Sequence, residues 1–161
     1  LGVYGVTGNH EYIGGADDAV NYLNNHGVTM LLDKVKLIKD SFYLVGRDDL
    51  AKPRFSGKER KKLIDLLQNI DTKKPIIVID HQPYKPKEVA KLPIDLQLSG
   101  HTHDGQIWPF TLGVRVIFPI TYGLKKIGNT YFYVSSGYGT WGPPVRIGNS
   151  PEIAIITVKF K

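Results

Sequence analysis

The stretch at residues 75–81 reads Pro-Ile-Ile-Val-Ile-Asp-His, and it decides the kind of fold to expect. Four consecutive β-branched apolar residues indicate a strand that is covered on both faces, as in the parallel sheets of α/β proteins. The run is followed at once by two titratable side chains, Asp80 and His81. Because α/β proteins bind ligands at the carboxyl ends of their strands, the stretch predicts a central strand with a functional histidine at its end.

Two other stretches of the chain repeat this arrangement. The apolar residues 3–6 lead into a polar loop, Thr-Gly-Asn-His-Glu at 7–11, and the alternating residues 94–99 lead into Gly-His-Thr-His-Asp-Gly-Gln at 100–106. Three predicted strand ends therefore carry four of the five histidines, which are His10, His81, His101 and His103. Taken singly, each histidine is more often an ordinary hydrogen-bonding residue than a ligand. Their shared position favours a cation site that Asn9 supports.

The rest of the chain adds the helices and strands of an α/β fold. Helical spacing predicts a helix over residues 16–26, and Ser56 and Glu59 form a potential capping box for a helix that continues to Ile70. Short β-like runs predict the remaining strands, at residues 28–32, 35–38, 42–45, 114–118, 130–135 and 153–160. The expected architecture is mixed β-sheets flanked by helices.

Composition narrows the classes of protein that need consideration. With 161 residues, of which 42% are hydrophobic, the chain is long enough for one domain over residues 1–161 with a buried core. It has no cysteine, which excludes disulfides and thiol catalysis, and no apolar run reaches the roughly 20 residues of a membrane-spanning helix. The net charge of +6 is spread along the chain, so a solvated basic surface is favoured over a nucleic-acid partner.

In order and context, the three polar clusters resemble the last three motifs of the calcineurin-like metallophosphoesterases. Gly8-Asn9-His10-Glu11 matches that family's GNH(D/E) motif, His81 matches its strand-terminal histidine, and Gly100-His101-Thr102-His103 matches its GHxH loop. The resemblance runs over nearly the whole chain and is nearest to small bacterial phosphodiesterase-like members, which are often membrane-associated. It implies part of an α/β/β/α sandwich.

The resemblance also implies an activity and roles for individual residues. The activity is hydrolysis of phosphodiesters or phosphomonoesters by a centre of two divalent cations. Asn9, His81 and His101 would bind one cation and His103 the other, while His10 would stabilise the phosphate or protonate the leaving group. The cations would be Mn, Fe or Zn, since nitrogen and oxygen ligands suit all three.

One departure from the family pattern leaves a second interpretation open. The family's first two motifs, Asp-x-His and Gly-Asp, supply the remaining ligands, and neither occurs in this sequence, which begins at Leu1 after the point where they would lie. We therefore expect the C-terminal portion of a catalytic domain, whose two-metal centre is incomplete. The alternative is a metal-binding module without activity. Membrane association would require a segment outside this sequence, self-association could follow from sheet faces left uncovered, and the cellular location is not indicated.

Overall fold

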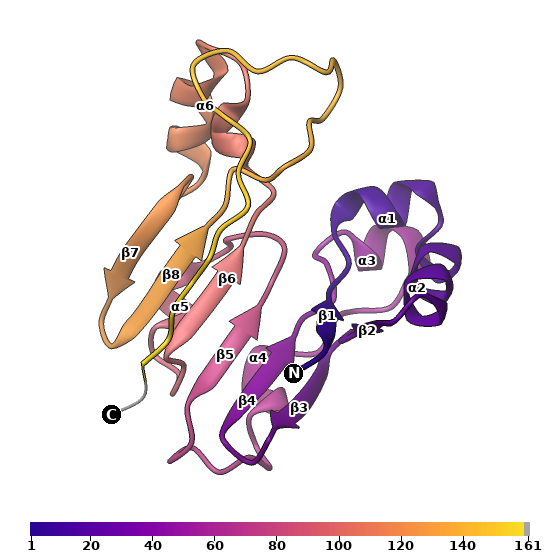
Figure 1. The fold of residues 1–161 in the computed structure, drawn as a ribbon, viewed down its shortest axis with the longest axis vertical. Helices are drawn as coiled ribbons and strands as arrows, with labels where there is room; N and C mark the ends of the chain where they lie inside the picture. The colour runs from indigo at the N-terminus through magenta and orange to yellow at the C-terminus, as the bar shows by residue number, and fades with distance from the viewer. Residues whose placement is uncertain (160–161) are drawn as a thin grey trace.

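A computed structural model describes residues 1–159 and contains a mixed six-stranded sheet (Figure 1). Its strand order is β3-β4-β5-β6-β8-β7, in which the inner neighbours β4, β5, β6 and β8 run parallel and the two outer pairs run antiparallel. The strands span Lys34–Ile38 (β3), Phe42–Gly46 (β4), Ile76–Ile79 (β5), Leu96–Ser99 (β6), Gly123–Ile127 (β7) and Thr130–Val134 (β8). The prediction of mixed β-sheets flanked by helices is confirmed.

The stretch at residues 75–81 lies where the sequence predicts, in the middle of this sheet. Successive residues of β5 point to opposite faces, so Ile76 and Val78 pack in one apolar cluster and Ile77 in another. The first cluster is closed by Leu63 of α4 (Leu63–Leu66) and Val89 of α5 (Pro86–Val89). Burial on both faces explains the unbroken apolar run.

The N-terminal part forms a separate two-stranded parallel sheet, β1 (Val3–Gly5) with β2 (Val28–Met30). Three helices cluster beside it, namely α1 (Asn9–Gly14), α2 (Ala16–Asn25) and α3 (Lys52–Ser56) (Figure 1). The small sheet is joined to the large one through the second apolar cluster, in which Leu31 lies beside Leu44 and Tyr4 packs against it. This arrangement brings the loop after β1 to the large sheet.

Two sequence predictions in the middle of the chain are wrong. Ser56 does not cap a following helix, because its hydroxyl donates to the carbonyl of Lys52 and Ser56 is the last residue of α3. Residues 58–62 are not helical, since Lys61 is held through its backbone by buried Asp33 and Arg47. Only Leu63–Leu66 of the long predicted helix is formed.

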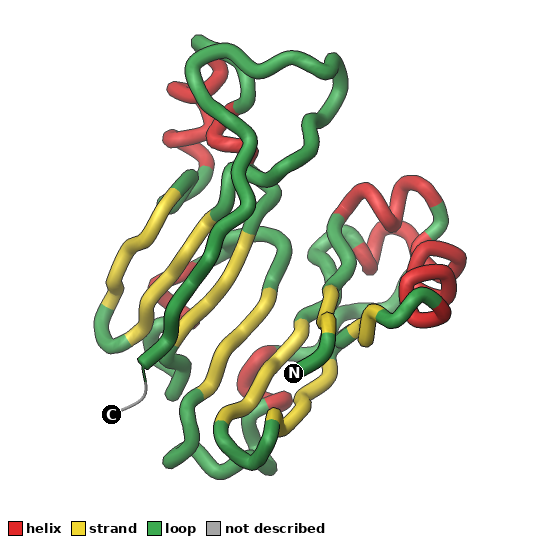
Figure 2. The backbone as a smooth tube through the Cα atoms, viewed as in Figure 1, coloured by secondary structure: helices red, strands yellow, loops and turns green. Residues whose placement is uncertain are grey.

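Other differences concern the C-terminal third and the first polar loop. Residues 114–117 belong to helix α6 (Phe110–Ile117), in which the amide of Phe118 donates to the carbonyl of Val114 as in an α-helix. Residues 153–159 form no strand and run along the large sheet as an irregular segment (Figure 2), while Phe160 lies outside the described residues. Asn9 opens a helix rather than lying in a loop. Within residues 1–159 there is no helix with the length and apolarity needed to cross a bilayer.

Candidate metal centre

Three predicted ligands meet at one point, and their donor atoms form a nearly equilateral triangle. The Oδ1 atom of Asn9 lies 3.1 Å from Nε2 of His81 and 3.1 Å from Nδ1 of His101, and the two imidazole nitrogens are 3.2 Å apart. We call these three residues the donor triangle. They come from α1 and from the ends of β5 and β6. The fold thus brings together side chains that are up to 92 positions apart in the sequence.

Local backbone structure explains how each member of the donor triangle is held. Asn9 is the first residue of α1, whose start is capped because the Gly8 amide donates to the Glu11 carboxylate at 2.7 Å. Gly8 also packs so closely on His81 that a β-carbon at Gly8 would lie 2.8 Å from its Nε2 atom. His101 has a left-handed backbone with φ of 69°, an unusual conformation for a residue with a side chain. Such conformations cluster at functional sites.

The environment keeps the two imidazoles of the triangle neutral. Burial lowers the pKa of His81, against the opposing effect of Asp49 and Glu11. Burial and the neighbouring His81 lower the pKa of His101 to about 4. A neutral imidazole has a free lone pair on one nitrogen, which is the form that binds a metal. The electrostatics therefore suit ligation at neutral pH.

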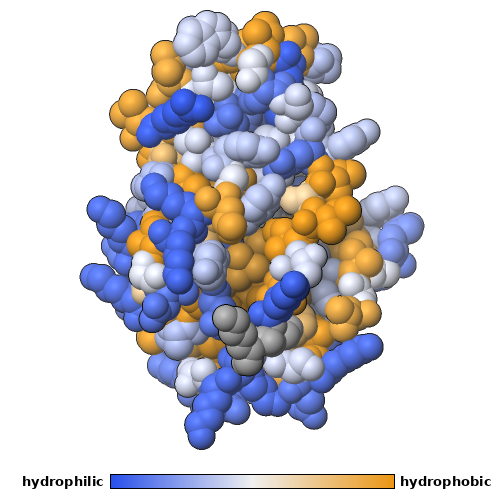
Figure 3. Space-filling model, turned by 60° about the vertical axis from the view of Figure 1, so that its left-hand side comes forward, coloured by the Kyte–Doolittle hydropathy of each residue, from blue (hydrophilic) through white to orange (hydrophobic). Residues whose placement is uncertain are grey.

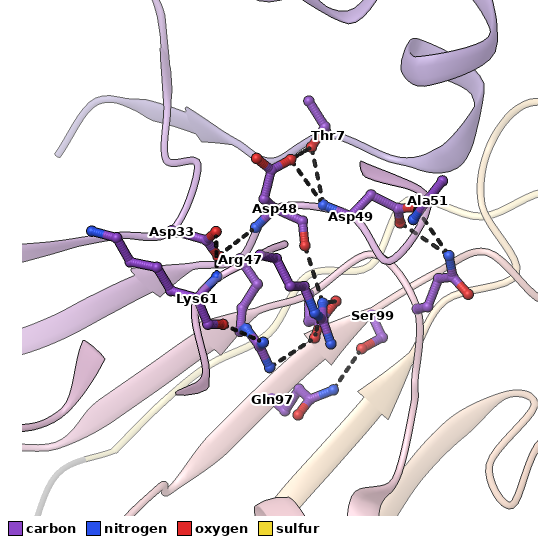
Figure 4. Close-up of polar contacts among 12 residues, drawn as sticks. Thr7, Asp33, Arg47, Asp48, Asp49, Ala51, Lys61, Gln97 and Ser99 are labelled. Carbon is purple, nitrogen blue, oxygen red and sulfur yellow. Dashed lines mark hydrogen bonds and ion pairs between the residues drawn. The ribbon is translucent and has the colours of Figure 1, made fainter. Parts of the chain in front are cut away.

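A buried network of charged and polar side chains connects the ends of β4 and β5 with the loop after β1 (Figure 4). Asp80, next to His81, receives two hydrogen bonds from Arg60 at 3.1 Å and an ion pair from Arg47 at 3.6 Å. Burial nevertheless raises the pKa of the Asp80 carboxyl. On the other side, the Thr7 hydroxyl donates to Asp48 at 2.7 Å, which fixes the residues leading to Asn9. The network positions two of the three ligands.

Asp49 is a site residue that the sequence analysis missed. It is completely buried and accepts hydrogen bonds from the side chain of Gln82, the residue after His81, and from the amide of Ala51. Its charge acts on both His81 and His101. The signal was present in the sequence, because Asp49 follows β4 just as His81 follows β5.

The other two predicted site residues do not join the donor triangle. His103 lies in a short 3-10 helix (His103–Gly105), and its Nδ1 atom lies 3.3 Å from the guanidinium of Arg146. Burial and this guanidinium lower the pKa of His103. His10 is exposed on α1, one residue after Asn9. Both histidines contribute to the electrostatic potential at His81, which places them near the triangle without a direct contact to it.

The donor triangle has the dimensions of one face of a cation's coordination shell. Ligands about 2.1 Å from a common ion are separated by roughly 3.0–3.4 Å, and the three observed separations are 3.1 and 3.2 Å. Among residues 1–159 no three His, Asp or Glu side chains are grouped in this way, because the third donor here is the amide oxygen of Asn9. The residues fit one divalent cation with mixed nitrogen and oxygen ligands.

Three relatives found by comparison with known proteins are all named for a metallophosphoesterase or its domain. The chain is 35% identical over 164 residues to an uncharacterized metallophosphoesterase of Aquifex aeolicus, covering 100% of this chain and 62% of the relative. It is 38% identical over 160 residues to an uncharacterized metallophosphoesterase of Helicobacter pylori strain J99, covering 96% and 42% of the respective chains. A transmembrane protein with metallophosphoesterase domain from Danio rerio is 33% identical over 171 residues, covering 99% and 39%.

These relatives are longer proteins, and the chain spans less than two thirds of the length of each. No family model and no solved structure matches the chain. The similarity nevertheless extends over nearly all of its residues, including the segments that carry Asn9, His81 and His101. From these relatives and the three ordered motifs, the chain belongs to the calcineurin-like metallophosphoesterase family.

Proposed function

We propose that this chain forms part of an enzyme that hydrolyses phosphate esters, either diesters or monoesters, with the help of divalent cations. The observation that carries the proposal is the donor triangle of Asn9, His81 and His101, whose three atoms lie 3.1–3.2 Å apart. The metallophosphoesterase relatives support the reaction class. A phosphate ester is the substrate that this class of reaction requires.

Each site residue has a role in the proposed reaction. The donor triangle would hold one cation, and a bound divalent cation polarises a phosphoryl oxygen and makes hydroxide available at neutral pH. His103 would bind a second cation through Nε2, because its Nδ1 atom is turned toward Arg146. His10, exposed beside Asn9, would donate a proton to the oxygen of the leaving group. Mn, Fe and Zn all suit these ligands.

A second candidate function is a module that binds one cation without catalysis. It is favoured by the absence of a carboxylate from the donor triangle among residues 1–159. The nearby carboxylate of Asp49 is already engaged by Gln82 and Ala51. A two-cation centre needs a carboxylate that bridges both ions. Without one, the chain by itself would hold only the cation bound by the donor triangle.

The two functions are separated by measuring cation binding and hydrolysis on the same protein. Mn²⁺ binding is measured by calorimetry, and hydrolysis is followed with p-nitrophenyl phosphate and bis(p-nitrophenyl) phosphate. We expect His101→Ala to weaken binding and to abolish any hydrolysis. His26→Ala is the matched control, since His26 follows α2 and stacks on Tyr22 away from the triangle.

Each outcome selects one of the two functions. Hydrolysis that is lost in His101→Ala and kept in His26→Ala supports the enzyme. Binding of Mn²⁺ without hydrolysis of either ester supports the module. If Mn²⁺ binds equally to the wild-type chain and to His101→Ala, the donor triangle is not the metal centre and both functions are contradicted.

A further inference from the structure

We propose that an apolar pocket beside the donor triangle binds an aliphatic substituent of the phosphate ester, which makes alkyl phosphate esters the preferred substrate class. The inference rests on the proposed function. The pocket has a volume of about 360 Å³, within the range of small-ligand sites. The walls that matter here are formed by Leu50, Pro83, Tyr84, Ile117 and Phe118. We call this cavity the Phe118 pocket.

The Phe118 pocket is adjacent to the donor triangle on two sides. The ring of Phe118 stands edge-on to the imidazole of His101, with 5.6 Å between the ring centres. Gln82, which also lines the pocket, directly follows His81 and donates to Asp49. A phosphate bound at the triangle would therefore have the pocket beside it, within reach of a substituent on an ester oxygen.

The charges around the Phe118 pocket suit a ligand that is anionic at one end and apolar at the other. Among residues 1–159, Lys85 is the one charged residue of the lining, and no Asp or Glu side chain is part of it. Lys85 pairs with the exposed carboxylate of Glu88 at 3.3 Å. The pocket is therefore lined mainly by apolar side chains, the amide of Gln82 in its lining already donates to Asp49, and its one charged side chain is a cation.

Apolar surface continues outward from the pocket along α6. Ile117 is 71% exposed and Val116 is 88% exposed, and Figure 3 shows apolar side chains gathered at the end of the molecule that carries this helix. A long substituent could leave the pocket and still lie on apolar surface. A larger cavity, lined by Thr72, Asp95 and Tyr131, lies at the opposite ends of β5 and β6 and has no such connection to the histidines.

The experiment compares ligands that differ only in chain length. Binding of ethyl phosphate and hexyl phosphate to the chain is measured by calorimetry with Mn²⁺ present. Each methylene buried in an apolar site strengthens binding about fourfold, so we expect hexyl phosphate to bind at least about tenfold more tightly. Ile117→Ser should reduce that preference about threefold or more, whereas Leu124→Ser, at an exposed apolar position that lines the other cavity, should leave it unchanged.

A second measurement distinguishes failure of the pocket from failure of the proposed function. The methyl signals of Leu50 and Ile117 are followed by NMR during titration with 1-hexanol, which has no phosphate. If hexanol shifts these signals but neither alkyl phosphate binds, the apolar pocket is supported and the phosphate site is contradicted. If hexyl phosphate has no advantage over ethyl phosphate, or keeps its full advantage in Ile117→Ser, the inference is overturned.

Discussion

The Nε2 atom of His81 lies 3.2 Å from the Nδ1 atom of His101, and this contact joins the ends of two adjacent parallel strands. The backbone supports it, because the amide of Gly100 donates to the carbonyl of His81 at 2.9 Å. The Oδ1 atom of Asn9 can only accept hydrogen bonds, and a neutral imidazole has one nitrogen that donates and one that accepts. Hydrogen bonds within the triangle therefore leave lone pairs unused, and a cation bound by all three atoms would use them.

Removal of the amide oxygen from the triangle should weaken cation binding. Asn9→Ala leaves the two imidazoles in place and takes away one of three donors, so we expect at least about a tenfold loss of Mn²⁺ affinity by calorimetry. His26→Ala should bind as the wild-type chain does. Equal affinity of Asn9→Ala and the wild-type chain would contradict the ligand role of Asn9.

Gly8 is expected to be indispensable to the geometry of the site. A β-carbon there would lie 2.8 Å from His81 Nε2, so Gly8→Ala should displace the imidazole and weaken Mn²⁺ binding at least about tenfold. Gly14→Ala is the control, because a β-carbon at Gly14 of α1 meets no atom within 4 Å. If Gly8→Ala binds Mn²⁺ as tightly as Gly14→Ala, the close approach of Gly8 to His81 has no role in ligation.

The central strand and the meeting of three candidate ligands could be predicted because both follow from local patterns. An apolar run such as residues 76–79 has few alternatives to a buried strand, and the polar residues that follow it must lie at one edge of the sheet. That rule predicts that His81 and His101 lie close together, and the structure places their nitrogens 3.2 Å apart. The rule applies equally to Asp49, which follows the end of β4.

The failures arose where tertiary contacts outweighed local preference. Ser56 and Glu59 have the spacing of a capping box, yet residues 58–62 are irregular, and the backbone of Lys61 among them is bonded to Asp33 and Arg47, which are distant in sequence. Residues 114–117 are rich in β-branched side chains but continue a helix that begins after Pro109. The contacts from Asp33 and Arg47 to Lys61 are not visible in a window of neighbouring residues.

Asp48 should stabilise the fold in a pH-dependent manner. Although burial disfavours its charge, hydrogen bonds from Tyr12, Lys52 and Thr7 lower the pKa of the Asp48 carboxyl. A lowered pKa means that this stabilisation is complete above the unfolded value of about 3.9 and is lost as the pH falls through the folded value. We expect Asp48→Asn to reduce the free energy of unfolding by about 2 kcal/mol at neutral pH.

Urea unfolding followed by circular dichroism at a series of pH values tests the role of Asp48. The difference between the wild-type chain and Asp48→Asn should be largest near neutral pH and should narrow below about pH 4. Asp17→Asn, at an exposed position in the first turn of α2, should change stability by less than about 0.5 kcal/mol. A difference that does not vary with pH would contradict a contribution from the ionised carboxylate.

Gln106 should hold the loop of residues 141–146, whose Arg146 contacts His103. Its side chain is fully buried, donates to the carbonyls of Trp141 and Pro143 at 2.8 and 3.2 Å, and accepts from the Trp141 amide at 2.8 Å. Farther along this segment, Arg146 contacts the His103 ring. In Gln106→Leu, three backbone groups lose their partner, so we expect a destabilisation of about 2 kcal/mol and increased exposure of the Trp141 indole.

Tryptophan fluorescence separates this effect from damage to the donor triangle. In a Trp108→Phe background the emission reports on Trp141 alone, and Gln106→Leu should shift it to longer wavelength. Mn²⁺ affinity should stay within about threefold of the wild-type value, because within residues 1–159 no hydrogen bond joins Gln106 to Asn9, His81 or His101. The triangle is held from β5, β6 and α1. Gln68→Leu, at an exposed position, is the control for the substitution itself. An unshifted emission would show that the Gln106 side chain does not hold the loop, whereas a large loss of Mn²⁺ affinity would show that the loop and the triangle form one cooperative unit.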